Sequence, residues 1–350
     1  MMPLHSLNRF AQAALALSLA IGLVACQGTP TPSAPTALPT AAIVVVATPA
    51  TSTPPAPTAP PAPAVGYLGA EPIPAEIVSA AAELGLSLSA SETVDALRGA
   101  EVLVSSAPER NGDVLAGGAA YPVLIGADAP PEGGLALDPT NLRADHAGFL
   151  LGLTAGLATE HLQVGVVSAG TAPDTLAYRN GFLSGVRYSC ATCLIDIFDL
   201  PELSDAAVAT SQGGQFATYG SDVIFVAPAP AASDMLQALV TNGIIVLGGE
   251  IDMTRAFGVD VNAWPETALA AARADLSGAL AHALRLYAAG TPPTGVQPLS
   301  LANAGLTVSP LHDPRGLISG LDQRDLDAAT VRVRTDALDV GVDAVTGEPK

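Results

Sequence analysis

Lysine and cysteine are scarce in this chain, and each shortage argues against a class of function. Lys350 is the sole lysine of 350 residues, and 14 basic side chains stand against 33 acidic ones, so the formal net charge at pH 7 is −19. A nucleic-acid-binding protein needs a basic face, so we predict no nucleic-acid partner. With only three cysteines, no second cysteine pair is left to complete a zinc site around Cys190 and Cys193.

Arrangements of residues that would support catalysis are also missing. Ser168 and Ser184 have no strained nucleophile turn and no histidine placed to form a triad. No glycine-rich phosphate loop is present. The histidines are scattered without the spacing of metal ligands: His146, His161, His282 and His312. We therefore predict that the chain is not an enzyme, with no catalytic residue, no metal and no cofactor.

The N-terminal residues have the pattern of an export signal. Arg9 precedes an apolar run at 11–23, and small residues then lead to Cys26. This pattern resembles a bacterial lipoprotein signal peptide over residues 1–26, which implies lipidation of Cys26 and attachment to the outer face of the cytoplasmic membrane. An ordinary secretory signal or an uncleaved anchor is the alternative. Residues 27–64 are rich in Pro, Thr and Ala, which predicts a disordered linker.

The remaining two cysteines are three residues apart, a spacing shared by redox and metal motifs. Redox chemistry of this type places the pair at a helix N-terminus, where the dipole lowers a thiol pKa. Cys190 and Cys193 instead follow a predicted helix and precede a predicted strand at 194–198. The position favours a structural disulfide in an oxidising compartment over a redox pair.

From Val65 onward, short apolar runs alternate with segments of helical periodicity, which predicts parallel β/α units and an α/β fold with helices on both sheet faces. Asp145 is a plausible N-cap for a helix that extends to Ala158. A helix from Pro265 to about Ala289 is also predicted, and residues 311–350 are predicted to form a charged tail. The predicted strands lie at 65–69, 101–105, 122–126, 164–168, 194–198, 222–226, 244–247, 257–261, 296–299 and 305–308.

The helix–strand–helix block in the middle of the chain resembles the basic membrane protein family of substrate-binding lipoproteins, the PnrA-like nucleoside receptors. The matching pieces are Phe149 to Gly156, Val164 to Gly170, and Tyr178 to Val186. The resemblance implies a type I periplasmic-binding fold, with two doubly wound parallel-sheet lobes of which the first is reduced. We assign the first lobe to 65–140 plus 256–292, and the second to 141–255 plus 293–310.

Ligands of open parallel sheets bind beyond the carboxyl ends of the strands. This rule selects Gly69, Ser105, Ser106, Asp128, Ser168, Gly170, Ala227 and Glu250. The resemblance implies that Glu250 lies at the position of the family's ligand-binding Asp, and it adds Asp252 at that of a second Asp. The alternative for Glu250 is a solvated loop carboxylate.

The resemblance also implies a small-molecule solute, such as a nucleoside, and the permease of an ABC importer as partners. The turn after the first strand departs from the family, because residues 70–74 lack the Asp, Asn and aromatic residue found there. The chain therefore has a second interpretation, as a degenerate, non-transport member that serves as an envelope interaction or sensing lipoprotein.

Overall fold

The structure, a computed structural model, describes residues 64–70 and 72–350 of the chain. The predicted signal peptide, Cys26 and the linker up to residue 63 lie outside the described residues. Within the described part of the chain, no helix is long and apolar enough to cross a membrane.

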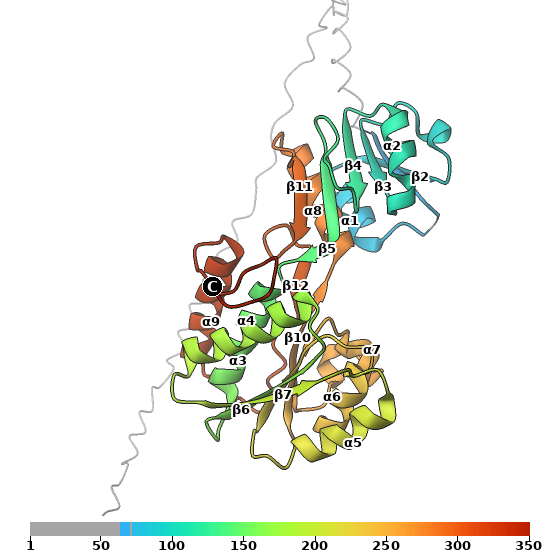
Figure 1. Cartoon of the computed structure of the whole chain (residues 1–350). Coiled ribbons are helices and arrows are strands. Elements are labelled where there is room, and N and C mark those ends of the chain that lie inside the picture. The colour runs from blue at the N-terminus through green and yellow to red at the C-terminus, as the bar shows by residue number, and fades with distance from the viewer. Residues whose placement is uncertain (1–63, 71) are drawn as a thin grey trace, which may run out of the picture. The chain divides into compact units, whose positions relative to one another are not determined.

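The first of two six-stranded sheets is parallel throughout, in the order β11-β5-β4-β3-β1-β2 (Figure 1). Its flanking helices include α1 (Ala75–Glu83), α2 (Asn111–Gly117) and α8 (Leu276–Ala288). Helix α8 packs against α1, and Arg285 pairs with Glu83 at 3.1 Å. The strands are β1 (Ala64–Leu68), β2 (Ser87–Ser91), β3 (Val102–Ser105), β4 (Tyr121–Ile125), β5 (Leu135–Leu142) and β11 (Gly295–Leu299).

The second sheet has the order β12-β10-β9-β8-β6-β7, and only its edge strand β12 runs antiparallel to its neighbour. Alternate residues of β8 enter two different cores, because neighbouring strand side chains point to opposite faces. The strands are β6 (Gln163–Ala169), β7 (Leu194–Leu200), β8 (Val223–Val226), β9 (Ile245–Gly249), β10 (Ala268–Ala274) and β12 (Leu306–Val308).

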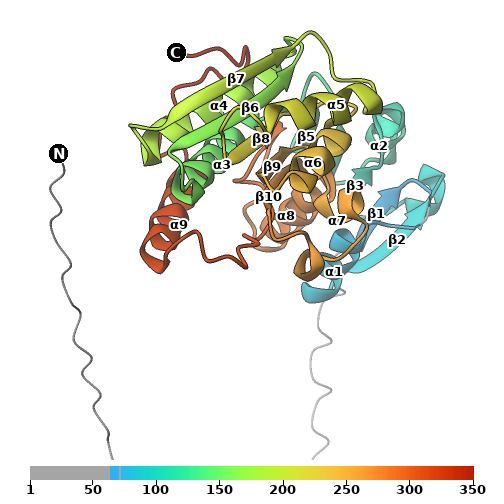
Figure 2. The ribbon, with the colours of Figure 1, turned by 90° about the horizontal axis from the view of Figure 1, so that it is seen from below.

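Helices cover both faces of this second sheet (Figure 2). Phe225 packs with the long helices α3 (Ala144–Ala158) and α4 (Pro173–Ser189), whereas its neighbour Ile224 packs with the helices of the other face. Those helices are α5 (Ala206–Phe216), α6 (Ala232–Thr241) and α7 (Met253–Phe257). The predicted α/β fold with two doubly wound, largely parallel lobes is therefore confirmed.

Glycines bring α3 and α4 into backbone contact. A Cβ on Gly152 would collide with the carbonyl oxygen of Phe182, and one on Gly185 with the carbonyl oxygen of Phe149. The four-residue glycine spacing in α3 predicts close packing on the sheet, but the close partner is α4, whose Gly181 also lies against the α3 backbone.

The segment after α7 differs most from the prediction. Residues 257–261 form no strand, and the predicted long helix from Pro265 is instead strand β10 followed by α8. Alanine favours a helix locally, but the run 268–274 pairs with β9 on one side and β12 on the other. Strand β10 therefore lies in the second sheet and β11 in the first, which corrects the assignment of 256–292 and 293–310 to lobes.

Other differences are local. Strands β2 and β5 were not predicted, because their sequences are polar or interrupted by proline. Arg143 occupies the N-cap of α3, while Asp145 lies in the first turn and is buried. Three short 3₁₀ helices complete the connections, at Val94–Leu97, Pro108–Arg110 and Val261–Ala263.

The predicted C-terminal tail is an integral part of the molecule. Helix α9 (Gly320–Arg334) begins with a capping box at Ser319 and packs against α3. Val333, Val340 and Val342 are buried in the same core as the α3 side chains. The predicted disulfide between Cys190 and Cys193 is present, at the end of α4.

Candidate functional site

The carboxyl ends of three second-sheet strands border a cavity of about 350 Å³. Gly170 follows β6 with a φ of +75°, a value that glycine adopts without a Cβ penalty. Thr175 from the start of α4 and Glu202 after β7 lie on the same cavity. Gly170 therefore lies where the strand-end rule predicts a ligand.

Glu250 follows β9, and its carboxylate is held by two donors. The hydroxyl of Tyr178 donates to one oxygen at 2.6 Å, and the backbone N–H of Ala274 donates to the other at 3.0 Å. Burial, together with the Glu250 charge, keeps the pKa of Tyr178 well above its ordinary value, so the phenol remains a donor. Glu250 itself is exposed and has a φ of +51°. Its solvent-facing carboxylate is thus oriented by the fold rather than free in a loop.

Asp252 is the N-cap residue of helix α7. One carboxylate oxygen accepts from the backbone N–H of Arg255, and the other lies 3.6 Å from the Arg273 guanidinium. Asp252 and Arg273 border a cavity of about 430 Å³ beside β10 and β12, which Trp264 also lines.

In the first sheet, the predicted residues Gly69, Ser105 and Ser106 lie together at the ends of β1 and β3. A Cβ on Gly69 would be 2.5 Å from the Ser106 hydroxyl oxygen, so glycine is needed there. Ser105 is fully buried and donates to the carbonyl oxygen of Ala107 at 2.6 Å. Ser106 remains partly exposed. A ligand reaching Ser105 would have to displace an internal hydrogen bond.

A carboxylate of the first sheet raises the pKa of an acidic residue at the start of α4. Burial raises the pKa of Asp174, at the start of α4, and the Asp138 carboxylate on β5 raises it further. Thr140 donates to Asp138 through both its hydroxyl and its N–H. These two carboxylates from different lobes therefore disfavour a further anion and suit a neutral or cationic group.

A second polar network occupies the ends of β6 and β7. Ser168 donates its hydroxyl to Asp199, and Arg179 donates to both oxygens of the same carboxylate at 3.0 Å. Burial raises the pKa of Asp199, but these hydrogen bonds outweigh it and lower the pKa overall. Ser168 is thus tied to an ionised carboxylate, with no base at hand to activate it.

The arrangement offers fixed hydrogen-bond acceptors and hydroxyls rather than reactive groups. Within residues 64–70 and 72–350, no cluster of His, Cys, Asp and Glu is placed to hold a metal ion. Sequence reasoning missed Tyr178, Thr175 and Glu202. Thr175 and Glu202 follow strand ends and could have been found by the same rule that selected Gly170. Tyr178 could not, because its contact with Glu250 spans 72 residues of sequence.

Comparisons with known proteins bear on the family and the fold of this chain. Residues 140–256 match the family model described as "ABC transporter substrate-binding protein PnrA-like", which confirms the family predicted from the sequence over this segment. That family consists of substrate-binding proteins, in agreement with the prediction that the chain is not an enzyme. No curated protein matches the chain.

Solved structures share the fold at low identity. An ABC transporter solute-binding protein from Conexibacter woesei DSM 14684 is 18% identical, with a TM-score of 0.54 over 79% of this chain and 97% of that one. A transcriptional activator of the comK gene from Bacillus halodurans is 13% identical, with a TM-score of 0.56 over 79% and 98% of the two chains. The type I periplasmic-binding fold is thus shared by a solute-binding protein and a transcriptional activator.

Proposed function

We propose that this chain, whose residues 140–256 match the PnrA-like substrate-binding family, binds a small polar solute outside the cytoplasm and delivers it to the permease of an ABC importer. The two lobes close on the solute by rotation about the segments that connect them. The observation that supports this most is the cavity at the ends of β6, β7 and β8, bordered by Gly170, Thr175 and Glu202. It lies where open parallel sheets bind ligands.

The charges at the strand ends narrow the class of solute. Carboxylates lie at or near these ends: Glu202 follows β7, Glu250 follows β9, Asp174 is at the start of α4, and Asp138 on β5 acts on Asp174. Carboxylates accept hydrogen bonds from hydroxyl and amino groups and repel anions. We therefore propose a neutral or cationic solute rich in hydroxyl groups, and a nucleoside satisfies this description.

In this proposal, Glu250 is the main ligand acceptor of the second lobe. The Tyr178 hydroxyl donates to one carboxylate oxygen and the Ala274 amide donates to the other, so the carboxylate is held in one orientation. The remaining lone pairs are available to a pair of adjacent hydroxyls. Ser106, beside Gly69, supplies a hydroxyl from the first lobe.

Thermal unfolding with a panel of nucleosides, sugars and polyamines tests the solute-binding function. A true ligand stabilises the folded protein by RT ln(1 + [L]/Kd), about 2.7 kcal/mol at a hundredfold excess over Kd. The expected result is a concentration-dependent rise in Tm with a neutral or cationic polyol. No rise with any member of the panel would contradict the proposal.

Glu250→Gln tests the site. This variant keeps one acceptor oxygen but removes the charge, so we expect the Kd for the solute to rise about tenfold, the loss of one charge-assisted hydrogen bond. Glu132→Gln is the matched control, because Glu132 is an exposed carboxylate in the connection between β4 and β5. Isothermal titration of both variants measures the difference, and equal affinities would remove Glu250 from the site.

We also propose attachment to the membrane through a lipid on Cys26. The support is the apolar run at 11–23 followed by small residues and a cysteine. Cys26→Ser should move the expressed protein from the membrane fraction to the soluble extracytoplasmic fraction. Protein that stays on the membrane after this change would indicate an uncleaved anchor instead.

A second candidate function is that of an envelope interaction or sensing lipoprotein. The observation that favours it is in the first lobe, where Ser105 is engaged internally and the turn at 70–74 lacks the family's polar ligands. Capture of a defined envelope protein, together with a flat solute panel, would support this function over transport.

A further inference from the structure

The segments that join the two lobes enclose a cavity whose lining is basic in an otherwise acidic protein. Its volume is about 320 Å³. Arg143, between β5 and α3, and Ser300, after β11, belong to two of these connecting segments. His282 comes from α8 against the first sheet, and Arg334 from the end of α9. Four parts of the chain therefore contribute to one cavity.

Basic side chains outnumber acidic ones in this lining, unlike in the molecule as a whole. Two arginines and two of the five histidines line the cavity, with Asp336 as the one carboxylate among the residues that line it. The whole chain has 33 acidic and 14 basic side chains. This local excess of cationic and imidazole groups distinguishes the cavity from the acidic strand ends described above.

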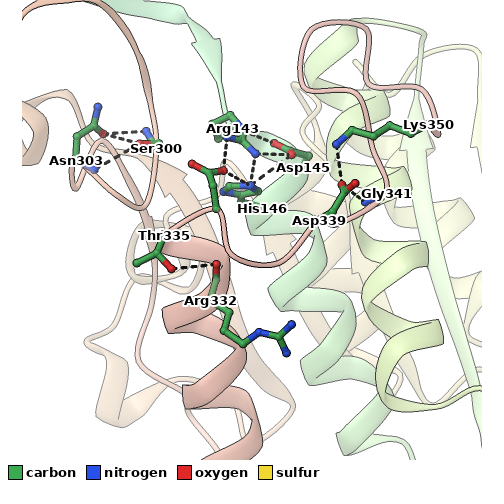
Figure 3. Close-up of polar contacts among 11 residues, drawn as sticks. Arg143, Asp145, His146, Ser300, Asn303, Arg332, Thr335, Asp339, Gly341 and Lys350 are labelled. Carbon is green, nitrogen blue, oxygen red and sulfur yellow. Dashed lines mark hydrogen bonds and ion pairs between the residues drawn. The ribbon is translucent and has the colours of Figure 1, made fainter.

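An internal anion, the Asp336 carboxylate, already lies at this cluster, next to the contacts among Arg143, Asp145 and His146 that Figure 3 shows. Asp336 accepts from the Arg143 guanidinium at 2.9 Å and lies 3.4 Å from Nε2 of His146. Arg143 also donates to both oxygens of the buried Asp145, at 3.0 Å each. Asp336 is mostly exposed, at 64%, and has a φ of +52°. Solvent and other anions can therefore compete with the Asp336 carboxylate for the Arg143 guanidinium.

Arg334 contributes a further positive charge to the lining of the cavity. Among the residues that the structure describes, its guanidinium makes no ion pair, in contrast to that of Arg143. Ser300 and Asn303 add hydroxyl and amide groups at the same cavity. Guanidinium, imidazole and hydroxyl donors around one cavity are the groups that bind oxyanions.

We propose that this connecting-segment cavity is a binding site for a small dianionic oxyanion, sulfate or inorganic phosphate, separate from the solute site. The anion contacts Arg334 and His282 and shares Arg143 with Asp336. Because its ligands come from α8, from the segment between β5 and α3 and from α9, a bound anion fixes these parts of the chain relative to one another. Anion binding is therefore linked to the position of the lobes.

Titration of the purified protein with sodium sulfate, at ionic strength held constant with sodium chloride, tests the site. We expect saturable binding by calorimetry and a rise in Tm above that of the chloride control. Arg334→Gln should weaken sulfate binding about tenfold, because it removes one charge-assisted contact.

Arg332→Gln is the matched control for that variant. It removes the same charge from the same helix, but the Arg332 guanidinium contacts the Tyr188 hydroxyl at 3.3 Å and points away from Arg143 (Figure 3). Its affinity for sulfate should equal that of the unmodified protein. Equal losses in both variants, or no sulfate effect beyond that of chloride, would overturn the proposal.

A gain in affinity provides a second test that misfolding cannot imitate. Asp336→Asn removes the internal competing anion, and asparagine tolerates the positive φ at this position. Sulfate binding should tighten several-fold in this variant. An unchanged or weaker affinity would show that Asp336 and the anion do not share a site. Neither result depends on which solute the strand-end site takes.

Discussion

At the scale of single residues, the buried charges of this acidic protein are supported by specific partners. Asp145 is 1% exposed and is satisfied by a two-bond contact with Arg143. His146, 3% exposed, lies between that guanidinium and Asp336. A buried charge without such a partner would cost several kcal/mol, so removing one member is expected to disturb the others.

The titration of His146 gives a prediction at this scale. Burial lowers its pKa; Arg143 and Lys350 act in the same direction, while Asp145 and Asp336 oppose them. Below the ordinary pKa of about 6.5, the unfolded chain takes up a proton that the folded protein resists, so stability falls as pH falls. We expect His146→Gln to reduce the slope of unfolding free energy against pH between 7 and 5 by up to about 1.4 kcal/mol per unit.

Urea unfolding at several pH values measures that slope. His161→Gln is the control, because His161 lies on the exposed connection between α3 and β6. The same slope in His146→Gln and in the unmodified protein would show that this imidazole does not control the acid sensitivity.

At the scale of elements, helices α3 and α4 pack with their backbones in direct contact. Glycines at four-residue intervals in both helices allow backbone to meet backbone, and the apolar residues beside them cover one face of the second sheet. The close approach fixes where α4 begins, and with it the positions of Thr175 and Tyr178. Helix packing therefore determines the geometry of the proposed solute site.

Gly152→Ala tests this contact. The added methyl group would collide with the Phe182 carbonyl oxygen, so the helices must separate, and we expect a loss of about 3 kcal/mol in unfolding free energy. Gly214→Ala in α5 is the control, because nothing lies within 4 Å of its Cβ position. Removing a helical glycine there should stabilise by about 0.5–1 kcal/mol. Denaturant unfolding measures both changes, and a neutral Gly152→Ala would contradict the backbone contact.

At the scale of the whole molecule, the C-terminal segment joins the second lobe instead of trailing from it. Asn180 donates to the Gly347 carbonyl oxygen at 2.7 Å, and Lys350 pairs with Asp339 at 2.7 Å. Val333 is fully buried against the core that α3 and α4 share. The segment thus ties the start of α3 to the start of α4, next to the connections between the sheets.

A pair of valines in α9 tests this role. Val333→Ala should lower the unfolding free energy by about 2 kcal/mol, from lost burial and the cavity that remains. Val331→Ala, at a position 58% exposed, should change it by less than about 0.5 kcal/mol. Equal effects of the two substitutions in thermal unfolding would show that α9 does not pack on the core.

Much of the architecture was predictable because it is encoded locally. Apolar runs of four to seven residues separated by helical segments predict a parallel β/α fold, and the pattern from Phe149 to Val186 carries the family resemblance. The strand-end rule selected Gly69 and Gly170, which follow the carboxyl ends of β1 and β6. It could not show that Ser105 turns inward or that Tyr178 holds Glu250, because those contacts involve other elements.

The sequence by itself determined the fold class, the order of most elements, the local disulfide and the acidic character of the surface, since each depends on neighbouring residues or on composition. Only the tertiary structure decided that the alanine run of β10 is a strand, that β11 and β12 belong to opposite sheets, and that the charged C-terminus is part of a core. It also brought Arg143, His282 and Arg334 to one cavity. The physical reason is that sheet pairing and side-chain burial join segments far apart in the chain, and these long-range contacts outweigh local propensity.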